Sequence, residues 1–134
     1  MTTRASGPFD VKMNPQADEQ AGAAALARMT LDKQYHGDLE ATGQGQMLAA
    51  GGAIPTSGAY VAVERVTGTL AGRKGSFALV HRGIRTSSSQ ELSITVVPDS
   101  GTGELAGLSG QMGIEIAADG KHSYVLEYTL PTAR

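Results

Sequence analysis

Apolar and polar residues alternate along most of the chain, which is the pattern of half-buried β-strands. Glycine, with 18 copies, is concentrated in the short segments between these runs, where turns are expected. Two longer segments, 14–25 and 49–58, are predicted to be loops. The alternation predicts strands over Phe9–Met13, Leu26–Leu48 (one long strand or a bent pair), Tyr60–Leu70, Ser76–Ile84, Leu92–Val97 and Ser123–Leu130.

One twelve-residue pattern occurs twice in the chain. Gly68–Leu79 reads GTLAGRKGSFAL and Gly103–Ile114 reads GELAGLSGQMGI, while a weaker third copy, GDLEATGQGQML, begins at Gly37. Glycines on both sides of a short polar step, flanked by alternating apolar residues, are typical of a β-hairpin. Repeated hairpins in a chain of 134 residues favour one domain over 1–134, built as a sheet that closes into a small barrel.

The repeats also predict which side chains face the barrel interior. A two-residue turn at 73–74 sets Leu70 opposite Phe77, and the second copy is given the same register. Residues opposite each other in an antiparallel ladder share a face. The interior face then carries Leu70, Phe77, Leu79, Leu105, Met112, Ile114 and Ile116. The exterior face carries Val61, Val63, Ala78 and Val80.

Two ionisable residues fall on the interior face by the same count. Steps of two from Leu70 reach Glu64, and steps of two from Phe77 reach His81. The two are diagonal neighbours, roughly 7–8 Å apart between Cα atoms. Burial raises the pKa of a carboxyl and an imidazolium partner lowers it, so such a pair can transfer a proton. The alternative is a purely structural role, as a polar pin between two strands.

The tyrosines fall at alternating strand positions. They are candidates to line a cavity and donate hydrogen bonds to a ligand, or to be core residues with the hydroxyl near water. The four are Tyr35, Tyr60, Tyr124 and Tyr128, and Tyr35 shares a face with Leu31, Lys33 and Leu39. In the last strand, a three-residue turn starting at Ala118 buries Tyr124 and Tyr128, whereas a two-residue turn buries Glu127. We prefer the first because it buries the more apolar set.

Composition excludes several classes of function. Eleven basic against thirteen acidic residues leave no surplus for a nucleic-acid partner. The chain has no cysteine, so thiolate chemistry and disulfides are excluded. His36 lies beside Asp38 and Glu40 on a polar strand face, which we read as solvated surface without a metal. No apolar run long enough for a signal peptide or a membrane span is present, and no cofactor motif, so we expect a cytoplasmic protein without a cofactor.

The repeat region resembles a bacterial family known as domain-of-unknown-function family 3224. The resemblance is carried by YHGDLEATGQGQML, YVAVERVTGTLAGRKGSFALVHRG and VVPDSGTGELAGLSGQMGI. That family is similar in structure to the allene oxide cyclases and, more distantly, to the dirigent proteins. The resemblance implies an all-β fold, an antiparallel barrel of about eight strands that forms homo-oligomers. It does not supply active-site residues, because the motif of the cyclases has no counterpart here.

The leading hypothesis is a cofactor-independent isomerase or cyclase that acts on a small apolar molecule in the barrel lumen. Glu64 and His81 are its proton-transfer groups. The expected ligand-binding residues are Tyr35, Tyr60, Phe77, Leu79, Met112, Tyr124 and Tyr128. One alternative is a non-catalytic barrel that binds or carries a hydrophobic molecule. Another is a barrel filled by its own side chains that acts through protein partners.

Overall fold

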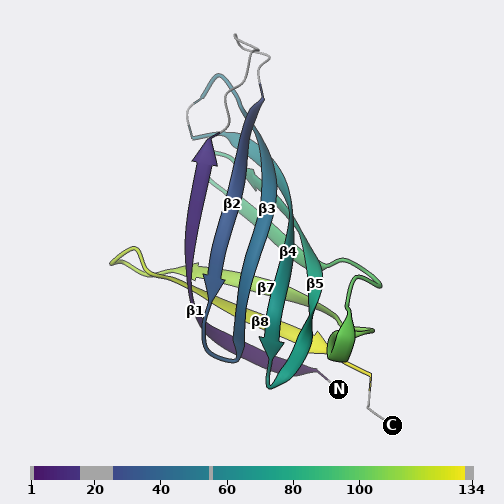
Figure 1. Ribbon diagram of the computed structural model, residues 1–134. Coiled ribbons are helices and arrows are strands. Elements are labelled where there is room, and N and C mark those ends of the chain that lie inside the picture. The colour runs from purple at the N-terminus through teal and green to yellow at the C-terminus, as the bar shows by residue number, and fades with distance from the viewer. Residues whose placement is uncertain (1, 16–25, 55, 132–134) are drawn as a thin grey trace.

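Eight antiparallel strands close into one barrel in the computed structural model, which confirms the expected all-β fold (Figure 1). The structure describes residues 2–15, 26–54 and 56–131. Each strand pairs with its neighbours in chain order, and β8 returns to pair with β1. The elements are β1 (Thr3–Pro15), β2 (Ala27–Tyr35), β3 (Leu39–Gly51), β4 (Gly58–Leu70), β5 (Arg73–Arg85), β6 (Gln90–Val96), the 3-10 turn η1 (Gly103–Leu105), β7 (Ser109–Ile116) and β8 (His122–Thr129).

The predicted loops are shorter than expected where the structure describes them. Asn14 and Pro15 belong to β1, and residues 16–25 lie outside the described residues. Residues 49–51 extend β3, and β4 begins at Gly58. The segment 26–48 is the bent pair rather than one long strand, because β2 ends at Tyr35 and β3 begins at Leu39. Backbone bonds from the 36–38 turn to β1, including His36 N–H to Pro8 C=O at 3.0 Å, fix this bend.

One end of the barrel is the end where β1 begins and β8 ends (Figure 1). Buried side chains fill it, and we call it the closed half. Inward side chains from every strand meet there, and the 36–38 turn, the 71–72 turn and η1 cover them. Its fully buried members include Tyr35, Leu39, Val66, Leu70, Phe77, Leu79, Leu105, Leu108, Tyr124 and Leu126. This packing supplies most of the apolar burial that stabilises the fold.

The first repeat forms the expected hairpin with a corrected register. The turn residues are Ala71 and Gly72, both with positive φ (49° and 84°), as a tight two-residue hairpin requires. Leu70 therefore pairs with Arg73, and Phe77 pairs with Val66. The predicted partner of each residue is wrong by four positions. Because four is even, every side chain keeps its predicted face.

The second repeat is not a hairpin of two strands, so that prediction is wrong. Its first part forms η1 and only its second part, from Ser109, forms a strand. The preceding segment lies along β5 instead, where Thr102 N–H donates to Ser76 C=O at 2.8 Å. Val97 N–H likewise donates to the carbonyl of Ala78 at 2.9 Å, so that segment covers Ala78. Ala78 was expected on an exposed exterior face and is only 7% exposed for this reason.

The C-terminal strand has the preferred register. Ala117 N–H donates to Lys121 C=O at 2.9 Å, which encloses a three-residue turn at 118–120. Tyr124 and Tyr128 are buried, and Glu127 is exposed. The more apolar set therefore faces inward, as expected.

The barrel wall is weakest between β6 and β7. All thirteen residues of β4 pair with β5, whereas Thr95 with Gln111 is the single pair that joins β6 to β7 in the described chain. On either side of this pair β6 and β7 are unpaired with each other in the described residues, and we call this gap in the ladder the split. β7 and β8 cross the long strands at a steep angle (Figure 1). Ile116, expected in the interior, lies at this split and is 65% exposed. Within the described ranges, no helix is long and apolar enough to cross a bilayer.

The closed half should carry most of the folding stability. Leu126→Ala, at a position that is fully buried, should lower the free energy of unfolding by roughly 2–5 kcal/mol, because it leaves a cavity. Val63→Ala, on the exterior face and 58% exposed, should change it by about 0.5 kcal/mol or less. Urea denaturation of both variants tests this, and equal losses would contradict the assignment of the two faces.

Candidate functional site

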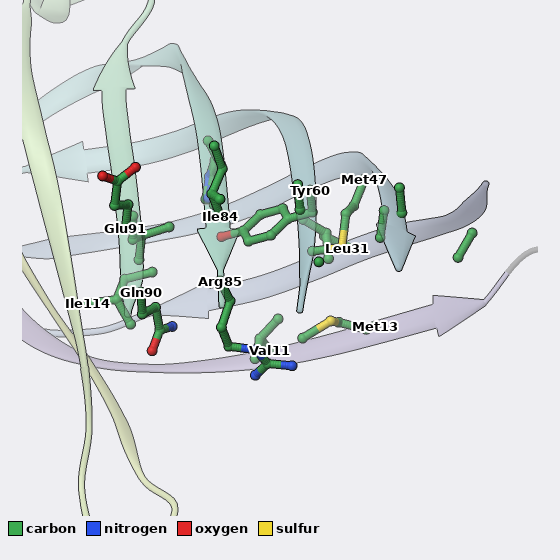
Figure 2. A pocket seen from close by; sticks show the side chains of 18 of the residues that line it. Val11, Met13, Leu31, Met47, Tyr60, Ile84, Arg85, Gln90, Glu91 and Ile114 are labelled. Atoms are coloured by element: carbon green, nitrogen blue, oxygen red, sulfur yellow. The ribbon is translucent and has the colours of Figure 1, made fainter. Parts of the chain in front are cut away.

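The other half of the barrel is hollow. Its cavity has a volume of about 550 Å³, within the range of small-molecule sites. Residues from all eight strands line it. Many of the lining side chains are apolar, among them Val11, Met13, Leu31, Met47 and Ile114 (Figure 2). Gln90, Leu92 and Ile116 also line it, so the cavity reaches the split between β6 and β7. The lumen is thus filled at one end and open at the other.

Tyr60 lies across the wall of the cavity. Its ring covers Gly83, the residue directly opposite on β5, and a Cβ added there would lie 2.2 Å from the ring. Figure 2 shows the Tyr60 hydroxyl directed toward the strand that carries Ile84 and Arg85. Burial raises the pKa of the Tyr60 hydroxyl, so the group is a neutral donor or acceptor for a ligand.

A buried ionisable cluster forms the floor of the cavity. The carboxylate of Glu64, on β4, accepts three hydrogen bonds from two other strands. Lys33 Nζ and His81 Nε2 both reach Oε1, at 3.0 and 2.9 Å, and the Tyr35 hydroxyl reaches Oε2 at 2.5 Å. Lys33 and His81 line the cavity, while Glu64 and Tyr35 lie behind them, outside its lining. Lys33 and His81 are therefore the two members of the cluster that the cavity reaches.

The backbone of β3 makes room for this cluster. Gly43 lies beside the Glu64 carboxylate, and a Cβ at this position would be 2.1 Å from Oε2. Any side chain here would displace the carboxylate from its three donors. A glycine in the interior of a strand is unfavourable in itself, so its presence at Gly43 is explained by this close approach.

The cluster keeps the Glu64 carboxyl ionised. Burial raises its pKa, but the hydrogen bond from His81, the charge of Lys33 and the hydrogen bond from Tyr35 together outweigh burial and lower the pKa below its ordinary value. Burial and the adjacent Glu64 charge raise the pKa of the Tyr35 hydroxyl, so it stays protonated and donates. Since an ionised carboxylate only accepts, His81 must donate through Nε2–H.

This arrangement leaves the other ring nitrogen of His81 free. Nδ1 has no hydrogen-bond partner in the described part of the chain. Since every fully buried polar side-chain atom of the described residues does have a partner, Nδ1 is not one of the fully buried atoms. His81 lines the cavity, so Nδ1 is the ring atom available to a ligand. In the neutral ring it is a lone-pair acceptor and thus a candidate base.

The structure brings together only some of the residues expected at the site. Glu64 and His81 are in direct contact and diagonal in the ladder, because Glu64 pairs with Leu79 and His81 pairs with Ala62. Tyr60 lines the cavity, whereas Tyr35 lies outside its lining and bonds Glu64. The remaining candidates, Phe77, Leu79, Met112, Tyr124 and Tyr128, lie in the closed half, away from the cavity.

Tyr124 has a structural contact in place of a ligand. Its hydroxyl donates to His36 C=O at 2.7 Å and accepts from Leu39 N–H at 2.9 Å, so it ties β8 to the turn between β2 and β3. His36 itself lies at the surface, 3.7 Å from Asp10 and 3.6 Å from Glu40. The described residues contain no group of three or more side chains able to hold a metal ion.

Lys33 is the member of the cluster that sequence reasoning missed. Lys33 lies two residues from both Leu31 and Tyr35, so strand alternation places it on the same face as these two buried residues. A lysine on a buried strand face was the sequence feature that could have identified it. Its side chain is 5% exposed, and its ammonium lies 5.3 Å from the ring centroid of Phe9 and 5.8 Å from that of Tyr35. Because Lys33 and Glu64 neutralise each other, neither is an isolated buried charge.

The fold and site together define a closed antiparallel β-barrel with an internal cavity and a buried ionisable cluster at its floor. The model of the family described as "Protein of unknown function (DUF3224)" matches residues 5–128, and the chain belongs to that family. A crystal structure of a protein of unknown function from the same family, from Shewanella oneidensis MR-1, is similar, with 45% sequence identity and a TM-score of 0.91. The match covers 99% of this chain and 100% of that one. No curated protein matches the chain.

Gly43 should be intolerant of any side chain. Gly43→Ala should destabilise the protein by roughly 1–3 kcal/mol, because the added methyl collides with the Glu64 carboxylate. Gly51→Ala, in the same strand with nothing within 4 Å of its Cβ, is the matched control and should cost almost nothing. Thermal unfolding of the two variants measures the difference. A Gly43→Ala protein as stable as the control would contradict the tight fit around the carboxylate.

Glu64→Gln should destabilise the protein in a pH-dependent manner. At pH 7 the loss should be about 3–5 kcal/mol, because Lys33 keeps a buried charge without its partner. The folded-state pKa of Glu64 is lowered, so its stabilising contribution is present above the ordinary value of 4.5 and is lost as pH falls through the lower folded-state value. The stability difference between wild type and variant, from urea titrations at several pH values, should therefore shrink below pH 4.5. A difference that is constant with pH would refute the assignment.

Proposed function

We propose that this barrel binds a small, largely apolar molecule in its cavity and isomerises or cyclises it by proton transfer, without a cofactor. The observation that supports this most directly is the position of His81, on the floor of an apolar cavity with one ring nitrogen bonded to Glu64 and the other free. A carboxylate that fixes the tautomer of a histidine is a common way to prepare a general base.

Each residue then has a distinct part in the proposed reaction. His81 Nδ1 takes a proton from the bound molecule and returns it at another position. Glu64 does not touch the ligand; it is a positioning residue that orients the ring and stabilises the imidazolium that forms. Tyr60 is a candidate to orient the molecule through its hydroxyl, and the apolar walls hold it in one conformation.

A non-catalytic binding barrel is the second candidate. The observation that favours it is that Lys33, Tyr35 and His81 already bond the same carboxylate, which a purely structural cluster would also do. A barrel filled along its whole length by its own side chains finds no such support, because one half of the lumen is hollow.

Deuterium incorporation tests the proposal even while the substrate is unidentified. A small-molecule extract is incubated in D₂O with wild-type protein, and mass spectrometry searches for compounds that gain deuterium at carbon. His81→Gln should slow this gain by roughly 100- to 10,000-fold, the usual contribution of a general base. His36→Gln, at an exposed histidine, is the matched control and should behave as wild type.

Binding must be measured alongside turnover to separate the two candidates. Ala49→Phe fills the cavity and should abolish binding, whereas Val61→Phe on the exterior face should not. A compound that wild type and His81→Gln bind equally, with no gain of deuterium in either, would favour the binding barrel. If every compound that wild type binds is bound equally by Ala49→Phe, the cavity is not a binding site and both functions are refuted.

A further inference from the structure

The Lys33 ammonium has unused hydrogen-bonding capacity at the floor of the cavity. An ammonium carries three N–H donors. Among the described residues, its only acceptor is Glu64 Oε1, at 3.0 Å. The aromatic rings of Phe9 and Tyr35 lie near it but supply no acceptor oxygen. A charged group that is almost fully buried and retains free donors is suited to an oxygen atom that a ligand brings into the cavity.

Lys33 and His81 lie close enough to act on one functional group. Both bond the same oxygen of Glu64, so Nζ and Nε2 are no further apart than two hydrogen-bond lengths. Both residues also line the cavity. The floor therefore offers a cationic donor next to a candidate base, within an otherwise apolar space.

We infer that the substrate is an apolar carbonyl compound, whose oxygen binds the Lys33 ammonium while His81 removes a proton from the adjacent carbon. This inference rests on the proposed function and names its substrate class. In the first step, the C–H bond breaks, its proton goes to His81 Nδ1, and its electron pair forms the carbon–carbon double bond of an enolate. The carbonyl electron pair moves to the oxygen beside Lys33. Return of the proton to the opposite face of the same carbon gives a stereoisomer. When the substrate carries a carbon–carbon double bond conjugated with the enolate, return to its far carbon gives a positional isomer, and neither route consumes an oxidant or reductant.

The charges of the cluster fit this step. Lys33 and Glu64 neutralise each other, and the proposed step starts from the neutral form of His81 and a neutral ligand. Afterwards the imidazolium of His81 pairs with Glu64, and the enolate pairs with Lys33. The buried site has no net charge in either state, so the reaction replaces one ion pair with two and leaves no isolated charge in a low-dielectric space. Donors fixed where negative charge develops are a main source of enzymatic rate enhancement.

Other features of the molecule carry less. The exterior face of β4 and β5 carries exposed apolar side chains, but nothing beside it identifies a partner. In the surface cluster of His36, Asp10 and Glu40, all three side chains are exposed to solvent. The pairing of free donors on Lys33 with the free nitrogen of His81 is the feature that points to a ligand of definite chemistry.

Binding of 2-naphthol and of naphthalene tests the oxygen site in the wild-type protein. The naphtholate anion resembles an enolate, and naphthalene is the same ring system without the oxygen. Wild type should bind 2-naphthol at least ten-fold more tightly than naphthalene. Its fluorescence should show that bound 2-naphthol ionises at a lower pH than free 2-naphthol, since Lys33 stabilises the anion. Equal affinities, or no change in ionisation, would overturn the inference.

Variants assign the effect to Lys33. Lys33→Gln, which keeps a donor for Glu64, should remove the ten-fold preference for 2-naphthol and leave naphthalene binding within about two-fold of wild type. Lys12→Gln, at an exposed lysine on β1, is the matched control and should retain the preference. Loss of naphthalene binding in Lys33→Gln would indicate that the substitution disrupts the cavity. The inference is then tested by the wild-type protein alone, through its preference for 2-naphthol over naphthalene and the pH at which bound 2-naphthol ionises.

Proton removal is tested with α-tetralone in D₂O, by NMR of the hydrogens next to its carbonyl. Wild type should exchange them at least ten-fold faster than either His81→Gln or Lys33→Gln. If neither naphthalene nor 2-naphthol binds at all, the proposed binding function itself fails. If both bind with equal affinity, that function stands and only the carbonyl assignment is overturned. A wild-type exchange rate equal to that of both variants would also overturn the assignment.

Discussion

The centre of the molecule depends on one buried carboxylate and its three donors. Glu64 joins β4 to β2 through Lys33 and Tyr35 and to β5 through His81, while Gly43 on β3 leaves the space it needs. An unpaired carboxylate at this depth would be strongly destabilising, so these four strands must be in register for the barrel to close. The same contacts fix the ring of His81 and the position of the Lys33 ammonium. Structural necessity and the candidate chemistry therefore share the same atoms.

Strand periodicity was sufficient to predict much of this arrangement. The alternation around Leu70 and Phe77 placed Glu64 and His81 on the interior face, and the choice of the more apolar set gave the correct register for β8. These predictions succeeded because a two-residue period decides a side chain's face even where its exact partner is misjudged. The error in the first hairpin was an even number of residues and so changed no face.

Longer-range features could not be predicted in the same way. The second repeat has the sequence pattern of a hairpin, but its first part forms η1. The segment before it is hydrogen-bonded to β5, and such a long-range contact cannot be predicted from local sequence. Periodicity also says which residues point inward without saying whether they meet. Phe77 and Met112 face the lumen as expected, yet they pack in the closed half, and the cavity lies further along the same strands. Lys33 was missed because an inward lysine has meaning only once its partner is known.

The wall between β6 and β7 gives the barrel a property that a fully paired ring lacks. A closed ladder has a circumference set by its hydrogen bonds, and it cannot widen without breaking many of them together. Here a single residue pair among the described residues, Thr95 with Gln111, completes the circle, and the cavity is lined by residues of both strands beyond this pair. The circumference of the barrel at that level is therefore constrained by only this one residue pair between β6 and β7. To admit a larger guest, β6 and β7 would have to give up only this pair, because β8 is held to β1 from His122 to Tyr128 and the other seams are fully laddered.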